Sequence, residues 1–289
     1  MSPDPYVAHR DLLFKVAYEM FGSVADAEDV VQETWLRWRD VDQAGVENPR
    51  AYLVRITTGL ALNQMRTAAR RRETYVGPWL PEPLITTGDV ADDVELADSV
   101  SLAMLVVLDS LGPAQRAVFV LHEVFGFAHT EIALALDRTP EAVRQLAHRA
   151  RAHVHERRAG GGDVDEHARV VEQFVEAAAG GDLQPLMDLM APDVVLLTDG
   201  GGRVKAALRP IRGVDKVLRF LTAVRSDEAR ISMVSGVNGG AALVVHVAGR
   251  LDAVATVRVQ GGLVTELHVV RNPDKVAGVA SGVAVRLTR

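Results

Sequence analysis

The sequence predicts a multidomain protein in which two all-α domains precede a C-terminal α+β cone with a curved antiparallel sheet. Three observations predict this fold class. Apolar residues recur at helical spacing through most of residues 7–158. A glycine run at 159–162 then separates this part from the rest of the chain. Beyond it, helical patterns give way to short apolar runs bounded by glycine turns, which is typical of an antiparallel sheet.

Length and composition set the first limits on function. The chain has 289 residues, of which 48% are hydrophobic, so it can form two or more domains with sizeable cores. It has no cysteine, which excludes disulfides and thiolate metal sites. No apolar run reaches the roughly 18 residues that cross a membrane, and the first residues lack the pattern of a signal peptide. We expect a cytoplasmic protein that uses no metal or cofactor and contacts no membrane.

The distribution of charge is more informative than the net charge of −6. Basic residues cluster at 66–72 and 144–158, whereas acidic residues cluster at 26–33 and 89–98. A uniformly basic protein would bind any DNA tightly. Two separate basic segments in a chain that is acidic overall instead predict DNA binding that requires a partner protein. The acidic surface would be available to bind that partner.

Three helices are predicted in the first 75 residues. Residues 7–22 are periodic and end at Gly22, and Ser23 then caps a second helix. Pro49 opens a third helix, which ends in arginines that the helix dipole favours. Taken alone, the polar face of the second helix reads as solvated surface. We expect that helix to bury Ala27, Val30, Val31, Thr34 and Leu36, with Trp38 nearby, and to expose Asp26, Asp29, Gln32, Glu33 and Arg37.

The segment 73–95 interrupts the helical pattern with prolines, glycines and an acidic end, so we interpret it as a linker. Trp79, Leu80 and Leu84 are apolar, which predicts that part of the linker docks on a domain. Helices are expected to resume near Glu95 and again after the turn at Gly112-Pro113.

Residues 128–155 predict a helix-turn-helix. Thr139 can cap the second helix, and Pro140 can occupy its first position, where a missing N–H costs nothing. Such a helix can lie in the DNA major groove. The alternative is an ordinary helical hairpin with a solvated basic face. The first helix has Ile132, Ala133, Leu134 and Leu136 at helical spacing; the second buries Val143, Leu146, Ala147, Ala150 and Val154 and presents Arg144, Gln145, His148, Arg149 and Arg151 on its other face.

The sequence pattern changes after the glycine run at 159–162. Helices are expected within 165–190 and at 214–224, and strand-like runs begin at 194, 231, 241, 252 and 263. The glycine pairs at 239–240 and 261–262 are expected to form hairpin turns between such runs.

Several of these segments, in this order, resemble the extracytoplasmic-function (ECF) sigma factors of bacterial RNA polymerase. The helix ADAEDVVQETWLRW precedes an NPRAYL helix ending in arginines, and a linker leads to SLGPAQRAVFVLHEVFGFAHTEIALAL and the helix-turn-helix. The resemblance covers about residues 8–157. It implies domains at 1–75 for sigma region 2, 76–96 for the linker, 97–158 for sigma region 4, 159–164 for the hinge and 165–289 for a regulatory domain.

Three further motifs are WLPEP at 79–83, DGGGR at 199–203 and NPDK at 272–275. They resemble the marks of the SigJ type of ECF sigma factor, which carries a fused domain similar to the SnoaL and nuclear-transport-factor-2 folds. The resemblance implies that this domain stands in for a separate anti-sigma factor. The glycine motif usually ends in Lys where this chain has Arg203, and the last motif usually continues with Leu where it has Val276. Glycines permit close approach of a loop to another surface. We therefore hypothesise one regulatory interface made of Trp79, Leu80, Pro81, Glu82, Pro83, Asp199, Gly200, Gly201, Gly202, Arg203, Asn272, Pro273, Asp274 and Lys275.

The resemblance also implies binding partners and the residues that would contact promoter DNA. Core RNA polymerase would bind the second helix through the clamp helices of its largest subunit and region 4 through its flap region, and the free chain is expected to be a monomer. The expected polymerase contacts are Asp29, Gln32, Glu33 and Arg37. The expected −10 promoter contacts are Asn48, Arg50, Asn63, Arg66 and Arg70, and Asn63 stands where many relatives carry Asp. The expected −35 contacts are Thr139, Arg144, Gln145, His148, Arg149 and Arg151.

Two other classes of function stay open. A one-component, ligand-sensing helix-turn-helix regulator would bind duplex DNA tightly without polymerase, which the acidic balance disfavours. An enzyme would use an Asp/His pair in the cone, as some relatives of the C-terminal fold do, and Asp199, His246 and His268 could supply one. A strand histidine flanked by valines is more often a core or surface group, so we expect regulation rather than catalysis. A small ligand in the cone is a further candidate partner.

Overall fold

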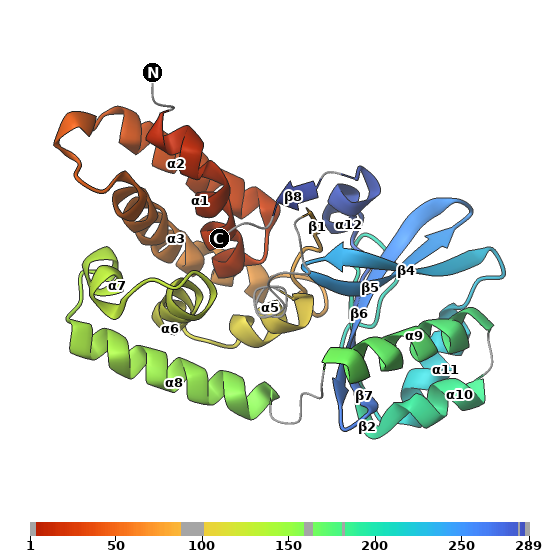
Figure 1. The fold of residues 1–289 in the computed structure, drawn as a ribbon. Helices are drawn as coiled ribbons and strands as arrows, with labels where there is room; N and C mark the ends of the chain where they lie inside the picture. Colours follow the sequence, from red (N-terminus) through yellow and green to blue (C-terminus); the bar gives the residue numbers. More distant parts are fainter. Residues whose placement is uncertain (1–3, 88–100, 159–163, 181–182, 283, 287–289) are drawn as a thin grey trace. The chain divides into compact units, whose positions relative to one another are not determined.

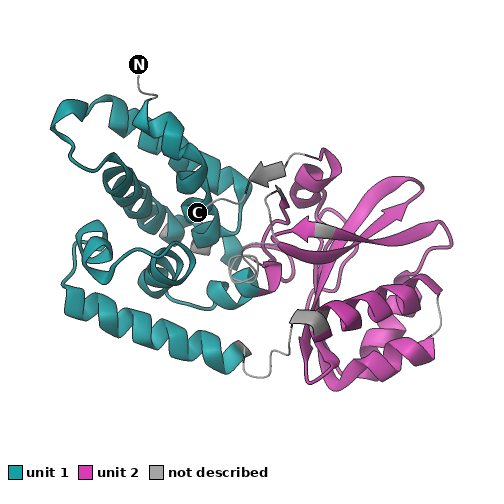
Figure 2. Cartoon of the chain, in the orientation of Figure 1, with its two compact units in different colours: residues 1–73, 104–157, 286–289 teal, residues 74–103, 158–285 magenta. Residues whose placement is uncertain are grey.

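The computed structural model describes residues 4–87, 101–158, 164–180, 183–282 and 284–286 (Figure 1). The chain divides into two compact units (Figure 2). The first unit contains residues 1–73, 104–157 and 286–289, and the second contains residues 74–103 and 158–285. Within the described ranges, no helix combines the length and the apolar character that crossing a membrane requires.

The first unit begins with three long helices whose ends follow the predicted signals. Asp4 caps the first helix by accepting a hydrogen bond from the Tyr6 amide at 2.8 Å, and Gly22 ends it in the left-handed conformation. Ser23 caps the second helix as predicted. The elements are α1 (Pro5–Phe21), α2 (Val24–Arg39), the 3₁₀ turn η1 (Gln43–Gly45) and α3 (Pro49–Glu73).

The buried face of α2 differs from the prediction at one position. Ala27, Val30, Val31 and Thr34 are buried as predicted, but Leu36 is 36% exposed. Trp38 completes the buried row and is only 1% exposed. The reason is helical geometry, because a residue two positions after Thr34 points away from the face that Thr34 shares, whereas one four positions later lies beneath it.

The second half of the first unit contains the helix-turn-helix. The helix predicted after Gly112-Pro113 is split into a regular part and a π-helical part, and the predicted restart near Glu95 falls outside the described residues. In the first helix of the motif Ile132 and Ala133 are buried, whereas Leu134 is 71% exposed. The elements are α5 (Leu102–Asp109), α6 (Pro113–Phe119), the π-helical η3 (Val120–Val124), α7 (His129–Leu136) and α8 (Pro140–Arg158).

The two halves of the first unit pack against each other. Every residue from 13 to 22 is buried, including the charged side chains of Lys15 and Glu19. A helix buried on all sides needs neighbours on all sides. Helices α2 and α3 cover one side of α1, while α6 and η3 contact it as well, and α3 also packs against α7.

The second unit is a curved sheet with α9, α10 and α11 on one face and with α12 apart from them (Figure 1). Its apolar core lies between the sheet and α9, α10 and α11. The sheet order is β3-β2-β7-β6-β5-β4-β1-β8, with β2 and β7 parallel and β4 to β7 joined as antiparallel neighbours. The bounds are α9 (Val164–Gly180), α10 (Leu183–Leu189), β2 (Met190–Asp199), β3 (Ile211–Arg212), α11 (Val214–Val224), β4 (Ala229–Val237), β5 (Gly240–Val247), β6 (Arg250–Gln260), β7 (Leu263–Val270), α12 (Pro273–Ala280) and β8 (Ala284–Arg286).

Both predicted hairpins are present, but the turn predicted at 239–240 lies one residue earlier, because Gly240 already belongs to β5. Strands β4 and β5 join through Asn238 and Gly239, and β6 and β7 join through Gly261 and Gly262, with positive φ at all four residues. Three of the described strands, β1, β3 and β8, were not predicted. The linker itself contributes β1 (Ile85–Thr87), which pairs with β4. The linker is therefore a structural part of the second unit.

Candidate functional site

The recognition helix α8 is set by a tight turn after α7. Asp137 adopts the left-handed conformation at the end of α7, and Thr139 accepts a hydrogen bond from the Ala142 amide at 3.2 Å. Pro140 occupies the first helical position, as predicted. Val143, Ala147, Ala150 and Val154 are buried, and Leu146 is half-buried.

All the residues expected at the −35 element lie on the exposed side of this motif. Arg144 pairs with Glu141 at 3.0 Å on its own helix, and both side chains are well exposed. Arg151 instead forms an ion pair with Glu123 of η3 at 2.7 Å. This ion pair links the recognition helix α8 to the π-helical segment that precedes α7. The exposed set is Thr139, Arg144, Gln145, His148, Arg149 and Arg151.

A pair of histidines beside this ion pair was not predicted. The rings of His122 and His129 lie 4.1 Å apart between centroids, and His122 Nδ1 is 2.9 Å from the Phe127 carbonyl oxygen. Desolvation and nearby cationic groups lower the pKa of His129. The lowered pKa favours the neutral form of His129, whose ring packs against that of His122. No spacing signal in the sequence distinguishes these two histidines from others.

The residues expected at the −10 element have different environments. Asn48 is exposed and caps α3, because its Oδ1 accepts a hydrogen bond from the Ala51 amide at 3.0 Å. The guanidinium of Arg50 lies 4.4 Å from the centre of the Phe127 ring, and Arg50 remains partly exposed. Asn63 is exposed. The side chains of Arg66 and Arg70 lie outside the described residues.

The face of α2 that is expected to contact polymerase is exposed in the first unit. Asp29, Gln32 and Arg37 are exposed, and Glu33 pairs loosely with Arg37 at 3.4 Å. Trp35 on the same helix is 39% exposed and was not among the predicted residues. The guanidinium of Arg39 lies 5.4 Å from the centre of the Trp35 ring. The exposed patch therefore combines charge with apolar surface.

The linker docks on the C-terminal unit through one buried carboxylate. Asp199, at the end of β2, is fully buried. Its Oδ2 accepts hydrogen bonds from Lys275 Nζ at 2.7 Å and from the Leu80 amide at 2.9 Å. Its Oδ1 accepts from the Tyr75 hydroxyl at 2.6 Å and from the Gly201 amide at 3.1 Å. All the hydrogen-bonding capacity of this carboxylate is thus used to join the linker, the glycine loop and α12.

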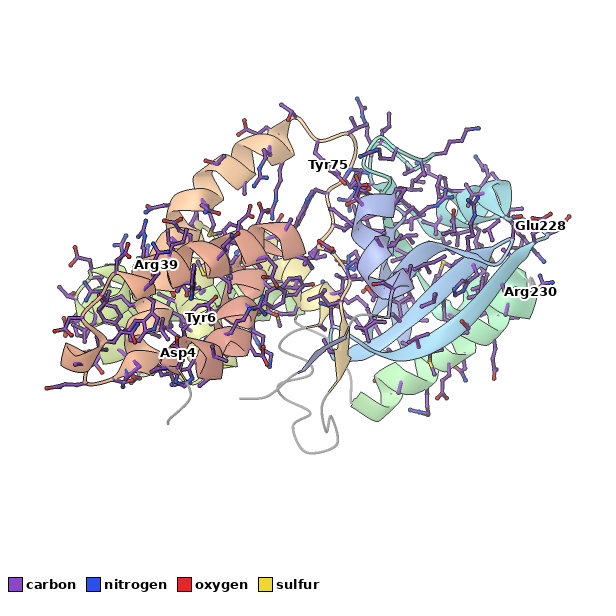
Figure 3. All side chains as sticks on the ribbon, turned by 90° about the horizontal axis from the view of Figure 1, so that it is seen from above. Asp4, Tyr6, Arg39, Tyr75, Glu228 and Arg230 are labelled. Carbon is purple, nitrogen blue, oxygen red and sulfur yellow. The ribbon has the colours of Figure 1, made fainter. Side chains whose placement is uncertain are left out.

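Lys275 completes the docking site from α12. Its Nζ also donates to the Leu80 carbonyl at 2.5 Å and lies over the rings of Trp79, at 4.2 Å, and Tyr75, at 5.0 Å. Tyr75, marked in Figure 3, was not among the predicted residues because it precedes the Trp79–Pro83 motif. Burial and its bond to Asp199 raise the pKa of Tyr75, so its hydroxyl stays protonated. We call Tyr75, Trp79, Leu80, Asp199, Asn272 and Lys275 the linker-docking site.

The glycine loop and the start of α12 fit closely around this site. Asn272 donates to the Tyr75 hydroxyl at 2.8 Å and caps α12 by accepting from the Asp274 amide at 3.1 Å. A Cβ on Gly201 would overlap the Asn272 amide, and its φ of +59° already requires glycine. Arg203 lies outside the buried cluster in an exposed pair with Asp274. Farther along the linker, Pro81 and Pro83 are buried, while Glu82 is partly exposed.

The structure does not assemble the candidate Asp/His pair. Leu196, Leu267 and Val257 are opposite one another on neighbouring strands and belong to the apolar core that the helices cover. His268 follows Leu267 on β7 and is not part of that core. The Nε2 atom of His268 lies 3.2 Å from the carboxylate of Glu266, and this contact lowers the pKa of Glu266. In the described part of the chain, Asp199 makes no hydrogen bond or ion pair with His246 or His268.

Comparisons with known proteins agree with this organisation. Residues 6–71 match Sigma-70 region 2, residues 101–154 match Sigma-70 region 4, and residues 171–273 match the SnoaL-like domain. The chain is 38% identical to the ECF RNA polymerase sigma factor SigJ of Mycobacterium tuberculosis, strain H37Rv, over 96% of this chain and 94% of that protein. It is 33% identical to the probable ECF sigma factor SigI of Mycobacterium tuberculosis, strain CDC 1551, over 92% of each.

A solved structure matches over nearly the same extent. The crystal structure of Mycobacterium tuberculosis SigJ superposes with a TM-score of 0.74 at 36% identity, covering 94% of this chain and 96% of that one. The similarity therefore spans both sigma regions, the linker and the C-terminal domain together.

Proposed function

The chain belongs to the extracytoplasmic-function RNA polymerase sigma factors, which serve transcription initiation, and we propose that its two sigma regions read the two promoter elements through the residues described above. Helix α8 reads the −35 element with Arg144, Gln145, His148 and Arg149. Asn48, Arg50, Asn63, Arg66 and Arg70, on and before α3, meet the −10 element.

The observation that carries this proposal is the polar face of α8. Its side chains at positions 144, 145, 148 and 149 are exposed together on a helix whose start is fixed by Thr139 and Pro140. Arginine and glutamine are suited to this role because they can form paired hydrogen bonds with guanine and adenine edges in the major groove. Thr139 contributes through the cap, and Arg151 contributes by contact with a phosphate.

The polymerase would dock on the open face of α2. Asp29, Gln32, Glu33 and Arg37 match a complementary charged surface on the clamp helices of the largest subunit, and Trp35 adds an apolar contact. Region 4 meets the flap region. We infer a monomer in the cytoplasm, where core polymerase works, and no enzymatic activity.

The C-terminal domain would act on transcription by holding the linker. The linker joins the two sigma regions, and the linker-docking site fixes it through Asp199 and Lys275. By holding or releasing this segment, the C-terminal domain would change how the two sigma regions are positioned for binding promoter DNA. In this way it takes the place of a separate anti-sigma factor. A small ligand in the cone would act through the same domain.

Run-off transcription tests the proposed function. Core RNA polymerase is mixed with the full chain on promoters recovered from the source genome, and on matched templates with a scrambled −35 element. We expect transcripts only when both the chain and the intact −35 element are present. Tight binding of the free chain to duplex DNA, without any transcript, would instead support the one-component regulator.

A further inference from the structure

The charged residues of the C-terminal domain are unevenly distributed along the chain. Residues 163–202 contain one Lys or Arg against nine Asp or Glu, whereas residues 203–219 contain six against one. This second segment covers the loop after β2, the strand β3 and the first turns of α11. Charges of one sign that gather in one place create a local field that the composition of the whole domain does not reveal.

Five of these six cations are exposed at one edge of the sheet, and we call them the basic edge: Lys205, Arg209, Arg212, Lys216 and Arg219. The strand β3, which carries Arg212, is the last strand at this edge. The helix α11 packs beside β3, and Lys216 and Arg219 lie three residues apart on it, so they share a face.

The backbone of the loop that carries Lys205 is held in place. The guanidinium of Arg271 donates to the Lys205 carbonyl oxygen at 2.7 Å, and Asp252 pairs with Arg271 at 2.8 Å. The Thr198 hydroxyl accepts a hydrogen bond from the Ala207 amide at 2.7 Å. The cationic side chains therefore project from an ordered backbone, which reduces the entropy lost when a partner binds.

The basic edge differs from other cations of the domain in lacking counter-charges. Arg203, the sixth cation of the segment, pairs with Asp274 at 2.9 Å. Arg258 pairs with Glu266 at 3.1 Å. Within the described ranges, no side chain of the basic edge forms a hydrogen bond or an ion pair. Neighbouring cations repel one another, so this arrangement does not stabilise the domain by itself, and an anionic partner would remove the repulsion.

We propose that the basic edge is a third DNA contact, which binds the phosphate backbone of promoter DNA without reading its sequence. Lys and Arg are the side chains that most often contact phosphate oxygens. The inference rests on the proposed function, because the two promoter-reading regions bring duplex DNA to a domain that is tethered to them. A tether raises the effective concentration of the DNA, so that contacts that are weak alone add to the affinity.

The composition of this surface favours DNA over a protein partner. Protein interfaces centre on apolar and aromatic side chains and are depleted in Lys. The segment 203–219, all of which the structure describes, offers one large exposed apolar side chain, Leu208, beside the five cations. Its acidic residue, Asp215, lies in the first turn of α11, where a carboxylate is favoured by the helix dipole.

The salt dependence of DNA binding tests the proposal, because each phosphate contact releases counterions. The full chain is mixed with core RNA polymerase, and its affinity for a labelled promoter duplex is measured over a range of salt concentrations. One double variant carries Lys216→Ala and Arg219→Ala. A matched control carries Arg230→Ala and Arg250→Ala, which remove the same charge from exposed positions on β4 and at the start of β6.

We expect the Lys216→Ala and Arg219→Ala variant to reduce the slope of log affinity against log salt by about 1.8, which is two contacts at about 0.9 each. The advantage of the wild type over this variant should then shrink about twelvefold between about 50 and 200 mM salt. The same change is expected on a template with a scrambled −35 element, because phosphate contacts carry no sequence information. The control should keep the wild-type slope.

Equal slopes for the wild type and the folded Lys216→Ala and Arg219→Ala variant, with folding checked by circular dichroism, would overturn the DNA contact. So would an unchanged slope together with weaker binding to core polymerase in the absence of DNA, since that result identifies an acidic protein surface as the partner. Run-off transcription by the wild-type chain is recorded alongside. Transcription with equal slopes removes the DNA contact and keeps the sigma function, whereas a changed slope without transcription keeps the contact and removes the function on which it rests.

Discussion

Lys275 and Asp199 together bind both backbone groups of a single linker residue. The Nζ of Lys275 donates to the Leu80 carbonyl, Oδ2 of Asp199 accepts from the Leu80 amide, and the two side chains lie 2.7 Å from each other. Because the contact is made to backbone, the linker is held at a fixed register. The rings of Trp79 and Tyr75 then cover the ammonium group.

Lys275→Met is expected to destabilise the C-terminal unit by about 3–5 kcal/mol, because it leaves the buried Asp199 carboxylate without its cation. Arg203→Ala removes an exposed pair with Asp274 from the same region and should cost less than about 1 kcal/mol. Thermal unfolding of the two full-length variants checks the difference. Equal shifts in melting temperature would contradict the assignment of the buried pair as the main contact.

Gly201→Ala is expected to destabilise the same unit by several kcal/mol, because the residue has positive φ and its Cβ would overlap the Asn272 amide. Gly59→Ala is the matched control. A Cβ there meets no atom within 4 Å, and the helical position favours alanine by about 1 kcal/mol. Urea titration should therefore move the two midpoints in opposite directions, and a loss of stability in both variants would show that the loop is not special.

Arg149→Ala is expected to reduce transcription from a −35-dependent promoter by about five- to 150-fold, the range for losing one paired contact to a base. Arg157→Ala lies on the same helix beyond the expected contacts and should change it little. Run-off assays with saturating core polymerase compare the two. If Arg149→Ala weakens all promoter sequences equally, Arg149 contacts phosphate rather than a base.

The first unit is expected to lose stability as pH rises. Burial raises the pKa of Glu19 from 4.5 to about 8, while Arg116 of α6 opposes that rise. Lys15, on the same helix, and Arg72 and Asp109, which lie beside Arg116, are the other charged groups nearby. Below pH 4.5 the Glu19 carboxyl is protonated in both the folded and the unfolded state, so the unit has its full stability. Between pH 4.5 and about 8, folding must take up a proton.

Each pH unit in that window should therefore lower the folding equilibrium constant of the first unit by up to tenfold. Urea titrations of the full chain, recorded from pH 5 to pH 8.5, measure the change in midpoint. Glu19→Gln should flatten this pH dependence. A wild-type midpoint that stays constant, or that rises at high pH, would contradict the assignment to Glu19.

The local features of the fold could be predicted from the sequence because short-range chemistry decides them. Ser23, Thr139 and Pro140 start helices through their own side chains or rings, and Gly22 ends one through its left-handed conformation. The hairpin at Gly261 follows from glycine in the same way. None of these depends on distant parts of the chain.

The buried charged residues of the first unit could not be predicted in this way. Glu19 and Lys15 fall on the polar face of α1 by periodicity, and Arg116 looks like a solvated helix residue. They are buried because α6 and η3 pack on α1, which is a contact between segments almost a hundred positions apart. The linker-docking site was predicted from its motifs. Tyr75 was missed because a lone tyrosine before a proline-rich run carries no pattern.

The docked linker also sets the length of a tether. Residues 74–87 lie in the second unit, where Leu80 and Leu84 are held by backbone hydrogen bonds and β1 is paired in the sheet. Fully extended at roughly 3.3–3.6 Å per residue, this stretch would span on the order of 50 Å. While it is docked, that reach is withdrawn from the connection between the two sigma regions. Under the proposed function, the strength of the docking site would therefore limit how far apart two promoter elements can lie and still be spanned by one molecule.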